Sequence, residues 1–314
     1  KKPIRLVLAY AGVDFVDKRY ESSERDVWLS DKPNLGLDFP NLPYYMDGDT
    51  KMSQYMAILR HVARKHGLMA RDGKELDLQE MVAEQITDIR LRFVFMVVYG
   101  PTDPDQVKQG YITGTLVPEL DELVKFMGAK QWLTGKLSYY LARFEALPAI
   151  KTYQRSSQYI QWPVVIPIAK WCRAVWLSDK PNLGLDFPNI PYYMDGDLKI
   201  SQSMAILKYL ARKHGLVARD DRELIKQEIV AEQLSDIRMR FIMGVVFSPK
   251  DLADVKDGYI TGSLIPQLDE LVKFLGNKQW LTTKLSYVDF IAYEILDWFR
   301  LFTPETIAKY PVIG

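Results

Sequence analysis

The stretch that decides the fold occurs twice in this chain. Residues 28–49 read WLSDKPNLGLDFPNLPYYMDGD, and residues 176–197 read WLSDKPNLGLDFPNIPYYMDGD. Outward from this stretch, the segment from Val27 to Tyr139 aligns without a gap with Val175 to Tyr287, and roughly 70% of the aligned positions are identical. Solenoid repeats are about 20 to 50 residues long, so this longer period predicts a domain duplicated in tandem.

Each repeat predicts a small α/β part. In the first repeat, residues 44–46 and 51–52 flank Asp-Gly-Asp, which is a hairpin signal between two short strands. We expect Ser53 to cap the helix that follows and Gly67 to end it. Before the repeat, the segment KKPIRLVLAYAG predicts an amphipathic helix and residues 14–20 predict a short strand.

A helical part follows in each repeat. Apolar residues recur at helical spacing from residue 78 to about residue 99, and again from residue 116 to residue 127, with Gly128 as the stop. The second repeat shows the same two stripes and then Ser286 and Asp289, which resemble a capping box in front of a further apolar helix. The sequence therefore predicts an α/β plus all-α fold, present twice.

The two repeats differ at their ends. After residue 139 the first repeat continues as LARFEALPAIKTY, which is typical of a terminal helix and tail, and the second repeat has no counterpart of residues 3–20. Both repeats are therefore expected to be incomplete, and an initial Lys in place of Met predicts that the sequence is a fragment. The expected parts are an α/β half (1–70), a helical half (71–158), a linker (159–173), a partial α/β half (174–218) and a second helical half (219–314).

Composition and charge restrict the function classes. Lys and Arg number 41 against 40 Asp and Glu, so the net charge of +1 argues against a large nucleic-acid interface. Cys172 is the single cysteine, which excludes an intrachain disulfide and favours a reducing, cytoplasmic location. Three His without Cys or carboxylate spacing give no metal site, no membrane span is expected, and no P-loop or dinucleotide fingerprint occurs.

Four stretches of the sequence are informative about its family: GLDFPNLPYYMDGDTKMSQYMAILRHVARKHGL at 36–68, AEQITD at 83–88, LVKFMGAKQWLTG at 123–135 and LSYVDFIAYEILD at 285–297. They strongly resemble the mu class of glutathione transferases. The segment at 3–20 is similar to the first helix and second strand of mu-class enzymes of mites and their relatives. The resemblance implies that each α/β half is thioredoxin-like and binds glutathione, and that each helical half shapes a pocket for an electrophile.

The resemblance also implies which residues bind glutathione. Asn41 and Leu42, with Asn189 and Ile190 in the second repeat, precede a cis proline whose neighbouring main chain pairs with the cysteinyl backbone. The other implied contacts hold the glycine end, the γ-glutamyl carboxylate at a helix N-terminus, or the γ-glutamyl ammonium of a neighbouring subunit. They are Arg25, Trp28, Lys32, Gln54 and Asp88 in the first repeat, and Trp176, Lys180, Gln202, Ser203 and Asp236 in the second. Tyr55 stands where the family has the serine that Ser203 keeps, which puts that contact in doubt.

The resemblance assigns two further features. Phe39 and Phe187 match the aromatic residue by which mu-class subunits insert into each other, so a homodimer or an intrachain pseudo-dimer is expected. Tyr99 resembles a tyrosine of the substrate pocket, although it falls one residue later than the family spacing.

No catalytic residue can be named from this sequence. The family activates the glutathione thiol with a tyrosine of a first-strand Gly-Tyr-Trp passage, and neither repeat contains that passage. The leading hypothesis is a glutathione transferase that conjugates glutathione, as co-substrate, to electrophilic small molecules in detoxification. The alternatives are a catalytically inactive glutathione-fold binding protein and a misassembled gene product.

Overall fold

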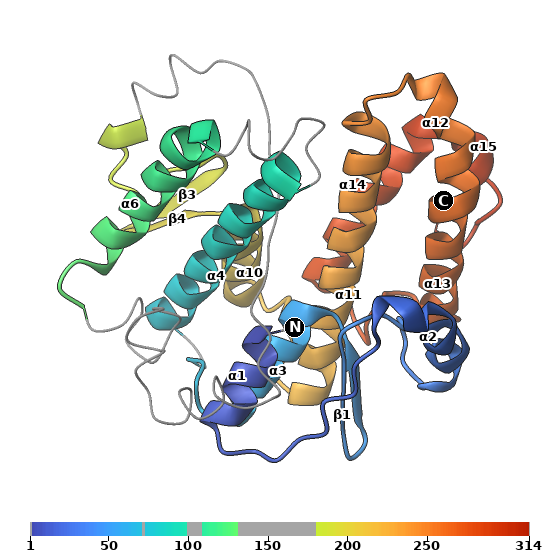
Figure 1. Cartoon of the computed structure of the whole chain (residues 1–314), viewed down its shortest axis with the longest axis horizontal. Helices are drawn as coiled ribbons and strands as arrows, with labels where there is room; N and C mark the ends of the chain where they lie inside the picture. The colour runs from blue at the N-terminus through green and yellow to red at the C-terminus, as the bar shows by residue number, and fades with distance from the viewer. Residues whose placement is uncertain (1, 71–72, 99–108, 131–179, 314) are drawn as a thin grey trace.

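The structure, a computed structural model, describes residues 2–70, 73–98, 109–130 and 180–313 (Figure 1). We call residues 2–130 the N-terminal half and residues 180–313 the C-terminal half. The expected linker, the expected terminal helix after residue 139, Tyr99 and Trp176 lie outside the described residues.

The N-terminal half contains an α/β part and a helical part. Its first helix, α1 (Lys2–Tyr10), confirms the amphipathic helix expected there. The other elements are the short helices η1 (Ser22–Glu24), α2 (Arg25–Asp31) and η2 (Lys32–Asn34), the strands β1 (Tyr44–Asp47) and β2 (Thr50–Ser53), the helices α3 (Tyr55–Lys65) and α4 (Gly73–Phe93), the π-helical turns η3 (Val94–Val98) and η4 (Ile112–Leu116), and α6 (Val117–Met127).

The C-terminal half repeats this order and continues it. Its elements are η5 (Lys180–Asn182), β3 (Tyr192–Asp195), β4 (Leu198–Ser201), α10 (Ser203–Lys213), α11 (Asp221–Phe241), η6 (Ile242–Val246), α12 (Leu252–Tyr259), η7 (Ile260–Leu264), α13 (Ile265–Leu275), α14 (Tyr287–Phe302) and α15 (Pro304–Ile307). The capping box expected before α14 is present, because Ser286 and Asp289 each accept a hydrogen bond from the other's backbone N–H.

Both expected hairpins are confirmed, and one expected strand is wrong. β1 pairs with β2, and β3 with β4, as two antiparallel two-stranded sheets in the same register. Gly48 takes a positive φ of 56° in the first turn, which suits the Asp-Gly signal. Residues 14–20 form no strand, because none of the described strands pairs with them and an extended segment without a ladder partner is not a β-strand.

The expected cap of α3 is also wrong. Gln54, not Ser53, is the N-cap residue of α3, and the Ser53 hydroxyl is buried without a hydrogen-bond partner among the described residues. Gln54 adopts a φ of 70°, and Gln202 a φ of 73° at the start of α10. A left-handed conformation is unfavourable for a residue with a β-carbon, and the chain adopts it here twice, immediately before two helices.

The two halves of the chain contact each other in two equivalent places, and we call each of these contacts a crossing. α3 of the N-terminal half packs against α11 of the C-terminal half, and α10 of the C-terminal half packs against α4 of the N-terminal half. Figure 1 shows α10 beside α4, and α3 beside the lower end of α11. Each α/β part therefore packs against the helical part of the other half.

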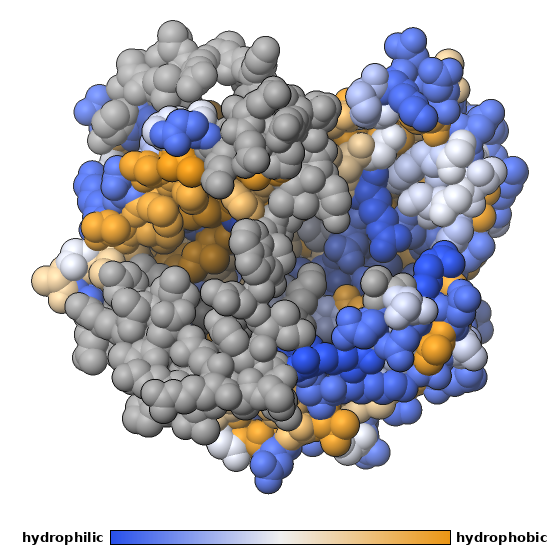
Figure 2. Space-filling view, in the orientation of Figure 1, coloured by the Kyte–Doolittle hydropathy of each residue, from blue (hydrophilic) through white to orange (hydrophobic). Residues whose placement is uncertain are grey.

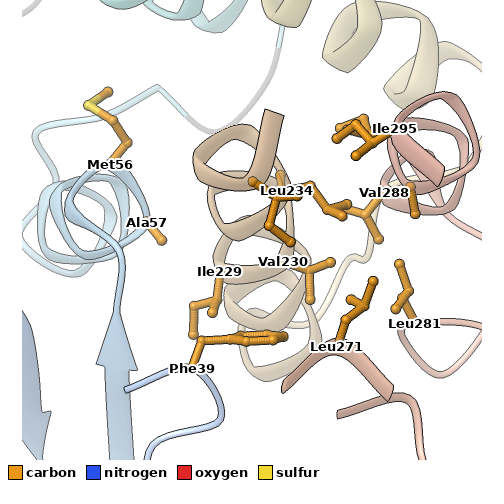
Figure 3. Close-up of a cluster of buried hydrophobic side chains, with 14 of the residues drawn as sticks. Phe39, Met56, Ala57, Ile229, Val230, Leu234, Leu271, Leu281, Val288 and Ile295 are labelled. Carbon is orange, nitrogen blue, oxygen red and sulfur yellow. The ribbon is translucent and has the colours of Figure 1, made fainter. Parts of the chain in front are cut away.

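The larger core follows the same crossing. Phe39, Ala57 and Ile58 from the N-terminal half share one cluster of buried side chains with Ile229 and Leu234 of α11. Figure 3 shows Phe39 below Ile229 and Val230, with Met56 and Ala57 on the facing helix. A smaller cluster joins Phe187 and Ile200 to Met81, Val82 and Phe126.

Among the described residues, none of the helices has both the length and the apolar content to cross a membrane. Within the same residues there is also no group of three His, Cys, Asp or Glu side chains placed to hold a metal ion.

Candidate glutathione site

The two phenylalanines assigned to subunit contacts lie in equivalent surroundings. The ring of Phe39 packs against Phe274 of α13, and the ring of Phe187 packs against Phe126 of α6, each with a centroid separation of 4.8 Å. Both side chains are fully buried, at 1% and 0% exposure. Each phenylalanine comes from the loop before a hairpin and enters the helical part of the other half.

The loops before the hairpins carry the expected cis prolines. The peptide bonds Leu42-Pro43 and Ile190-Pro191 are both cis. In each loop the preceding Asn accepts a hydrogen bond from the next backbone N–H at 2.9 Å, from Leu42 to Asn41 and from Ile190 to Asn189. The two loops therefore share one local geometry, although their two halves differ elsewhere.

The two left-handed glutamines reach across to the other half. Gln54 donates its side-chain N–H to Gln233 of α11 at 2.7 Å, and Gln202 donates to Gln85 of α4 at 2.6 Å. All four side chains are buried, so these bonds satisfy groups that would otherwise be desolvated without a partner. The bonds hold each helix start against the long helix of the other half.

The two aspartates lie one helical turn from the accepting glutamines. Asp236 follows Gln233 on α11, and its carboxylate accepts a bond from the Asn41 side chain at 3.4 Å. Asp88 follows Gln85 on α4 and accepts a side-chain bond from Gln202. Burial raises the pKa of the Asp88 carboxyl, and the guanidinium of Arg92, at 3.7 Å, opposes that rise.

The two sites differ in the residue that follows the left-handed glutamine, which is Tyr55 in the N-terminal half and Ser203 in the C-terminal half. The side chain of Ser203 is exposed at the first turn of α10. Tyr55, at the same place in α3, is half-buried beneath the guanidinium of Arg90, 5.1 Å from its ring centroid. The N-terminal half thus places an aromatic ring, and the C-terminal half an accessible hydroxyl, beside the helix start.

The basic residues that the resemblance assigns to the glycine end of glutathione differ in exposure and in ion pairing. Arg25 is exposed at the start of α2. The Lys32 ammonium lies 3.7 Å from the Glu270 carboxylate, and the Lys180 ammonium lies 2.7 Å from Glu122. Both lysines therefore form ion pairs between the two halves, which the sequence did not indicate.

Trp28 is part of an aromatic stack. Its ring is nearly parallel to Tyr44, with centroids 6.4 Å apart, and meets Tyr20 edge-on at 5.2 Å. The Tyr20 hydroxyl donates to Asp31 at 2.7 Å, and burial raises the Tyr20 pKa to about 12. The Tyr20 hydroxyl therefore stays protonated and bonds to the Asp31 carboxylate.

A buried ionic network at the centre of the crossing was not predicted. Arg60 binds Glu80, Glu84 and Glu232 at 3.1, 2.8 and 2.8 Å. Lys208, at the position equivalent to Arg60, binds Glu80 at 3.0 Å. Arg60 is the one charged residue among the buried residues of α3, and Lys208 is the one among those of α10. A cation in the middle of an apolar run was the signal available in the sequence.

A pocket of about 820 Å³ lies beside the first hairpin. Its walls come from α1, from residues 13–21 and from residues 42–47, with Lys65 and His66 at one end. Its lining includes one candidate glutathione contact, Leu42, but neither Gln54 nor Asp236.

Comparison with known proteins finds similarity to one family over part of the chain. The model of the glutathione S-transferase N-terminal domain matches residues 2–64 and 170–212. Over 141 residues, the chain is 44% identical to glutathione S-transferase B of Cavia porcellus and 45% identical to glutathione S-transferase Mu 1 of Mus musculus. Each alignment covers 44% of this chain and 63% of the relative, so the chain spans less than two thirds of these relatives.

One of the similar solved structures is a glutathione S-transferase. The glutathione S-transferase Blo t 8 is 39% identical, over 45% of this chain and 67% of that chain, with a TM-score of 0.38. The α/β parts are thioredoxin-like and are followed by helical parts, as the sequence predicted. Two segments of the chain therefore match the model of the glutathione S-transferase N-terminal domain, and 141 residues are similar to mu-class members of that family.

Proposed function

We propose that this chain is a glutathione transferase that binds glutathione between its two halves and conjugates the thiolate to electrophilic small molecules. One observation carries the proposal: Gln54 and Asn41 of the N-terminal half meet Gln233 and Asp236 of the C-terminal half. Gln202 meets Gln85 in the same way and also bonds to Asp88, whereas Asn41 makes the contact with Asp236 in the first site. Two similar sites, each built from residues of both halves, are expected if glutathione binds at both crossings.

The chemistry of these sites suits the γ-glutamyl end of glutathione. That end carries a carboxylate and an ammonium group. The N-terminus of α3 offers the backbone N–H groups of its first turn and the positive end of a helix dipole to the carboxylate. Asp236 offers a negative charge to the ammonium group. In the second site, α10 and Asp88 have the same two roles, and Ser203 adds a hydroxyl donor.

The proposal includes an intrachain pseudo-dimer, with Phe39 and Phe187 as its reciprocal anchors. It is supported by their equal burial and by the lysine–glutamate pairs that repeat between the halves. It also retains the five parts expected from the sequence, with boundaries at 70, 158, 173 and 218. The chain's single cysteine supports a reducing, cytoplasmic location.

We further propose that the N-terminal site binds glutathione more tightly than the C-terminal site. α1 packs directly on α3, so the helix that starts the first site is supported on two sides. The second repeat has no counterpart of residues 3–20 in its sequence. This support is expected to outweigh the hydroxyl contact that Tyr55 cannot make.

The test combines binding and turnover. Glutathione is titrated calorimetrically against the chain, against Gln54→Ala and against Gln202→Ala, and conjugation to an aryl halide is followed by absorbance. We expect binding in the parent chain, with a greater loss in Gln54→Ala. Equal losses, or a loss only in Gln202→Ala, would overturn the ranking of the sites. Binding without conjugation would identify an inactive glutathione-binding protein, and absence of binding would refute the proposal.

A further inference from the structure

Equivalent apolar faces in the two halves differ in how they are covered. In the C-terminal half, Leu264, Leu268 and Leu271 are buried at 0%, 1% and 2% exposure. The equivalent residues of the N-terminal half are Leu116, Leu120 and Leu123. Leu120 is 44% exposed, and the neighbouring Val124 is 60% exposed.

The difference extends to the long helices. Leu234 and Ile237 of α11 are buried, while the equivalent Ile86 and Ile89 of α4 are only half-buried. We call Ile86, Ile89, Leu116, Leu120, Leu123 and Val124 the α4–α6 face. Figure 2 shows hydrophobic residues gathered over α6 and α4 on one side of the molecule.

The C-terminal half shows what covers such a face. α14 packs on α11 and buries Val288, Ile291, Ile295 and Phe299, which recur at helical spacing. The ring of Phe299 meets Phe241 of α11 edge-on at 5.3 Å. Among the described residues, the chain therefore contains both a fully buried and a partly exposed version of one face.

The N-terminal half does not repeat the covering helix in its sequence. The positions equivalent to Val288, Asp289 and Phe290 hold Tyr140, Leu141 and Ala142. The capping acid and the apolar spacing of α14 are both lost at this point, so residues after 139 do not encode a copy of α14.

A carboxylate at the edge of the α4–α6 face also supports a covering segment of the α14 type, because in the C-terminal half the equivalent carboxylate bonds to the segment after α14. In the C-terminal half, the Tyr310 hydroxyl, which follows α14, donates to Asp269 of α13 at 2.7 Å. The equivalent Asp121 of α6 is exposed, and no hydrogen bond or ion pair to it is found among the described residues. The rim of the α4–α6 face thus keeps the acceptor that a covering segment uses in the other half.

We propose that the α4–α6 face binds an amphipathic helix of a partner protein whose apolar face is of the α14 type. Such a helix carries large aliphatic or aromatic side chains at the spacing of Val288, Ile291, Ile295 and Phe299, and acidic or polar residues on its outer face. A helix laid in an apolar groove is a recurring mode of recognition, and the anchors follow this spacing. The proposal does not depend on glutathione binding.

The experiment uses the full chain and a labelled peptide of residues 284–303 as the probe. We expect saturable binding by fluorescence anisotropy, and a loss of at least about tenfold in affinity for the Leu120→Asp/Val124→Asp chain, because a charge would be buried against the helix. Val16→Asp is the matched control, because Val16 is 95% exposed and lies outside the face. A peptide with Ile291→Asp and Ile295→Asp should not bind.

Three outcomes would overturn the proposal. They are absence of saturable peptide binding, equal binding by the double variant and the Val16→Asp control, and self-association of the chain through this face that the peptide does not displace. The last outcome, detected by sedimentation of the parent and the double variant, would assign the face to a second copy of the chain. Circular dichroism of each variant verifies that its helices are intact.

Discussion

The α3–α11 crossing and the α10–α4 crossing are built from equivalent residues, and their differences indicate which contacts matter. The phenylalanine anchors, the glutamine pairs and the lysine–glutamate pairs occur at both. The charged residues between them have diverged: Arg60 faces three carboxylates, and the equivalent Lys208 faces one. Anchoring and orientation are thus duplicated, while the electrostatics of the crossings are not.

The divergence has a structural reason. Arg212 of α10 binds Asp77 of α4 at 2.5 Å, but the position equivalent to Asp77 in the C-terminal half is Ile225. Arg64 instead binds Glu228 through both of its terminal nitrogens at 2.7 Å. Because Ile225 cannot accept an ion pair, Arg64 pairs with Glu228 of α11 one turn further along the helix.

The largest effect is expected from the anchors. Phe39→Ala should destabilise the chain by about 4–5 kcal/mol and Phe187→Ala by about 3 kcal/mol, within the range for buried phenylalanines. Phe39 lies in the larger buried cluster and Phe187 in the smaller one beside the α4–α6 face. Urea unfolding measures both, and Leu301→Ala, at a residue 79% exposed, is the control. A larger loss in Phe187→Ala than in Phe39→Ala would contradict the comparison.

The next effect concerns two neighbouring carboxylates with opposite pKa shifts. Burial alone would raise the pKa of Glu80, but Arg60 and Lys208 lower it to about 2 from 4.5. A lowered pKa contributes stability that is present above the unfolded value and is lost as pH falls from 4.5 toward about 2. Glu80→Gln should therefore lose roughly 3 kcal/mol at pH 7 and should unfold with less sensitivity to acid.

Glu84 should behave in the opposite way. Its burial raises the pKa above the usual range in spite of Arg60. A raised carboxyl pKa contributes stability that is present below the unfolded value and is lost as pH rises through the folded value. Glu84→Gln, which carries no charge at any pH, should thus retain stability at alkaline pH where the parent loses it. Thermal unfolding from pH 3 to pH 9 compares both variants, and parallel profiles would refute the assignment.

The sequence predicted local structure well and long-range polar contacts poorly. The hairpins, α1 and α14 with its capping box followed from residues close together in the chain, whereas the cis prolines followed from the family resemblance. The error at Ser53 arose because a capping pattern cannot reveal the left-handed φ of Gln54. The error at residues 14–20 arose because a strand needs a partner, and pairing is not encoded by the propensity of one segment.

The candidate site was predicted only in part. The resemblance gave Gln54, Gln202, Asp88 and Asp236, but their glutamine partners lie more than 100 residues away in the chain. Gln85 and Gln233 stand three residues before the aspartates, on the same face of a helix, and this spacing was the available signal. The ionic network around Arg60 depends on how the two halves cross, which no local pattern contains.

A moderate effect on ligand binding is expected at the position that differs between the sites. In the Gln202→Ala background, which leaves the N-terminal site to be measured, Tyr55→Ser should tighten glutathione binding about three- to tenfold, the value of one hydrogen bond. Calorimetric titration measures the change. Ser203→Tyr in the Gln54→Ala background is the reciprocal variant and should weaken binding. If Tyr55→Ser weakens binding instead, the half-buried ring is a structural support of the site.

The smallest effect is expected from the two exposed ion pairs, and it tests the comparison most finely. Lys180 approaches Glu122 to 2.7 Å, whereas Lys32 approaches Glu270 only to 3.7 Å, and all four side chains are about one-third exposed. Solvent screening limits such pairs to roughly 0.2–1 kcal/mol, so Lys180→Ala should cost about 0.5 kcal/mol and Lys32→Ala less. Urea unfolding at low and high salt measures both, because a Debye length of about 3 Å at 1 M salt should remove the difference. A difference that persists at high salt would show that the lysine stems contribute by packing between the halves and that the charges do not.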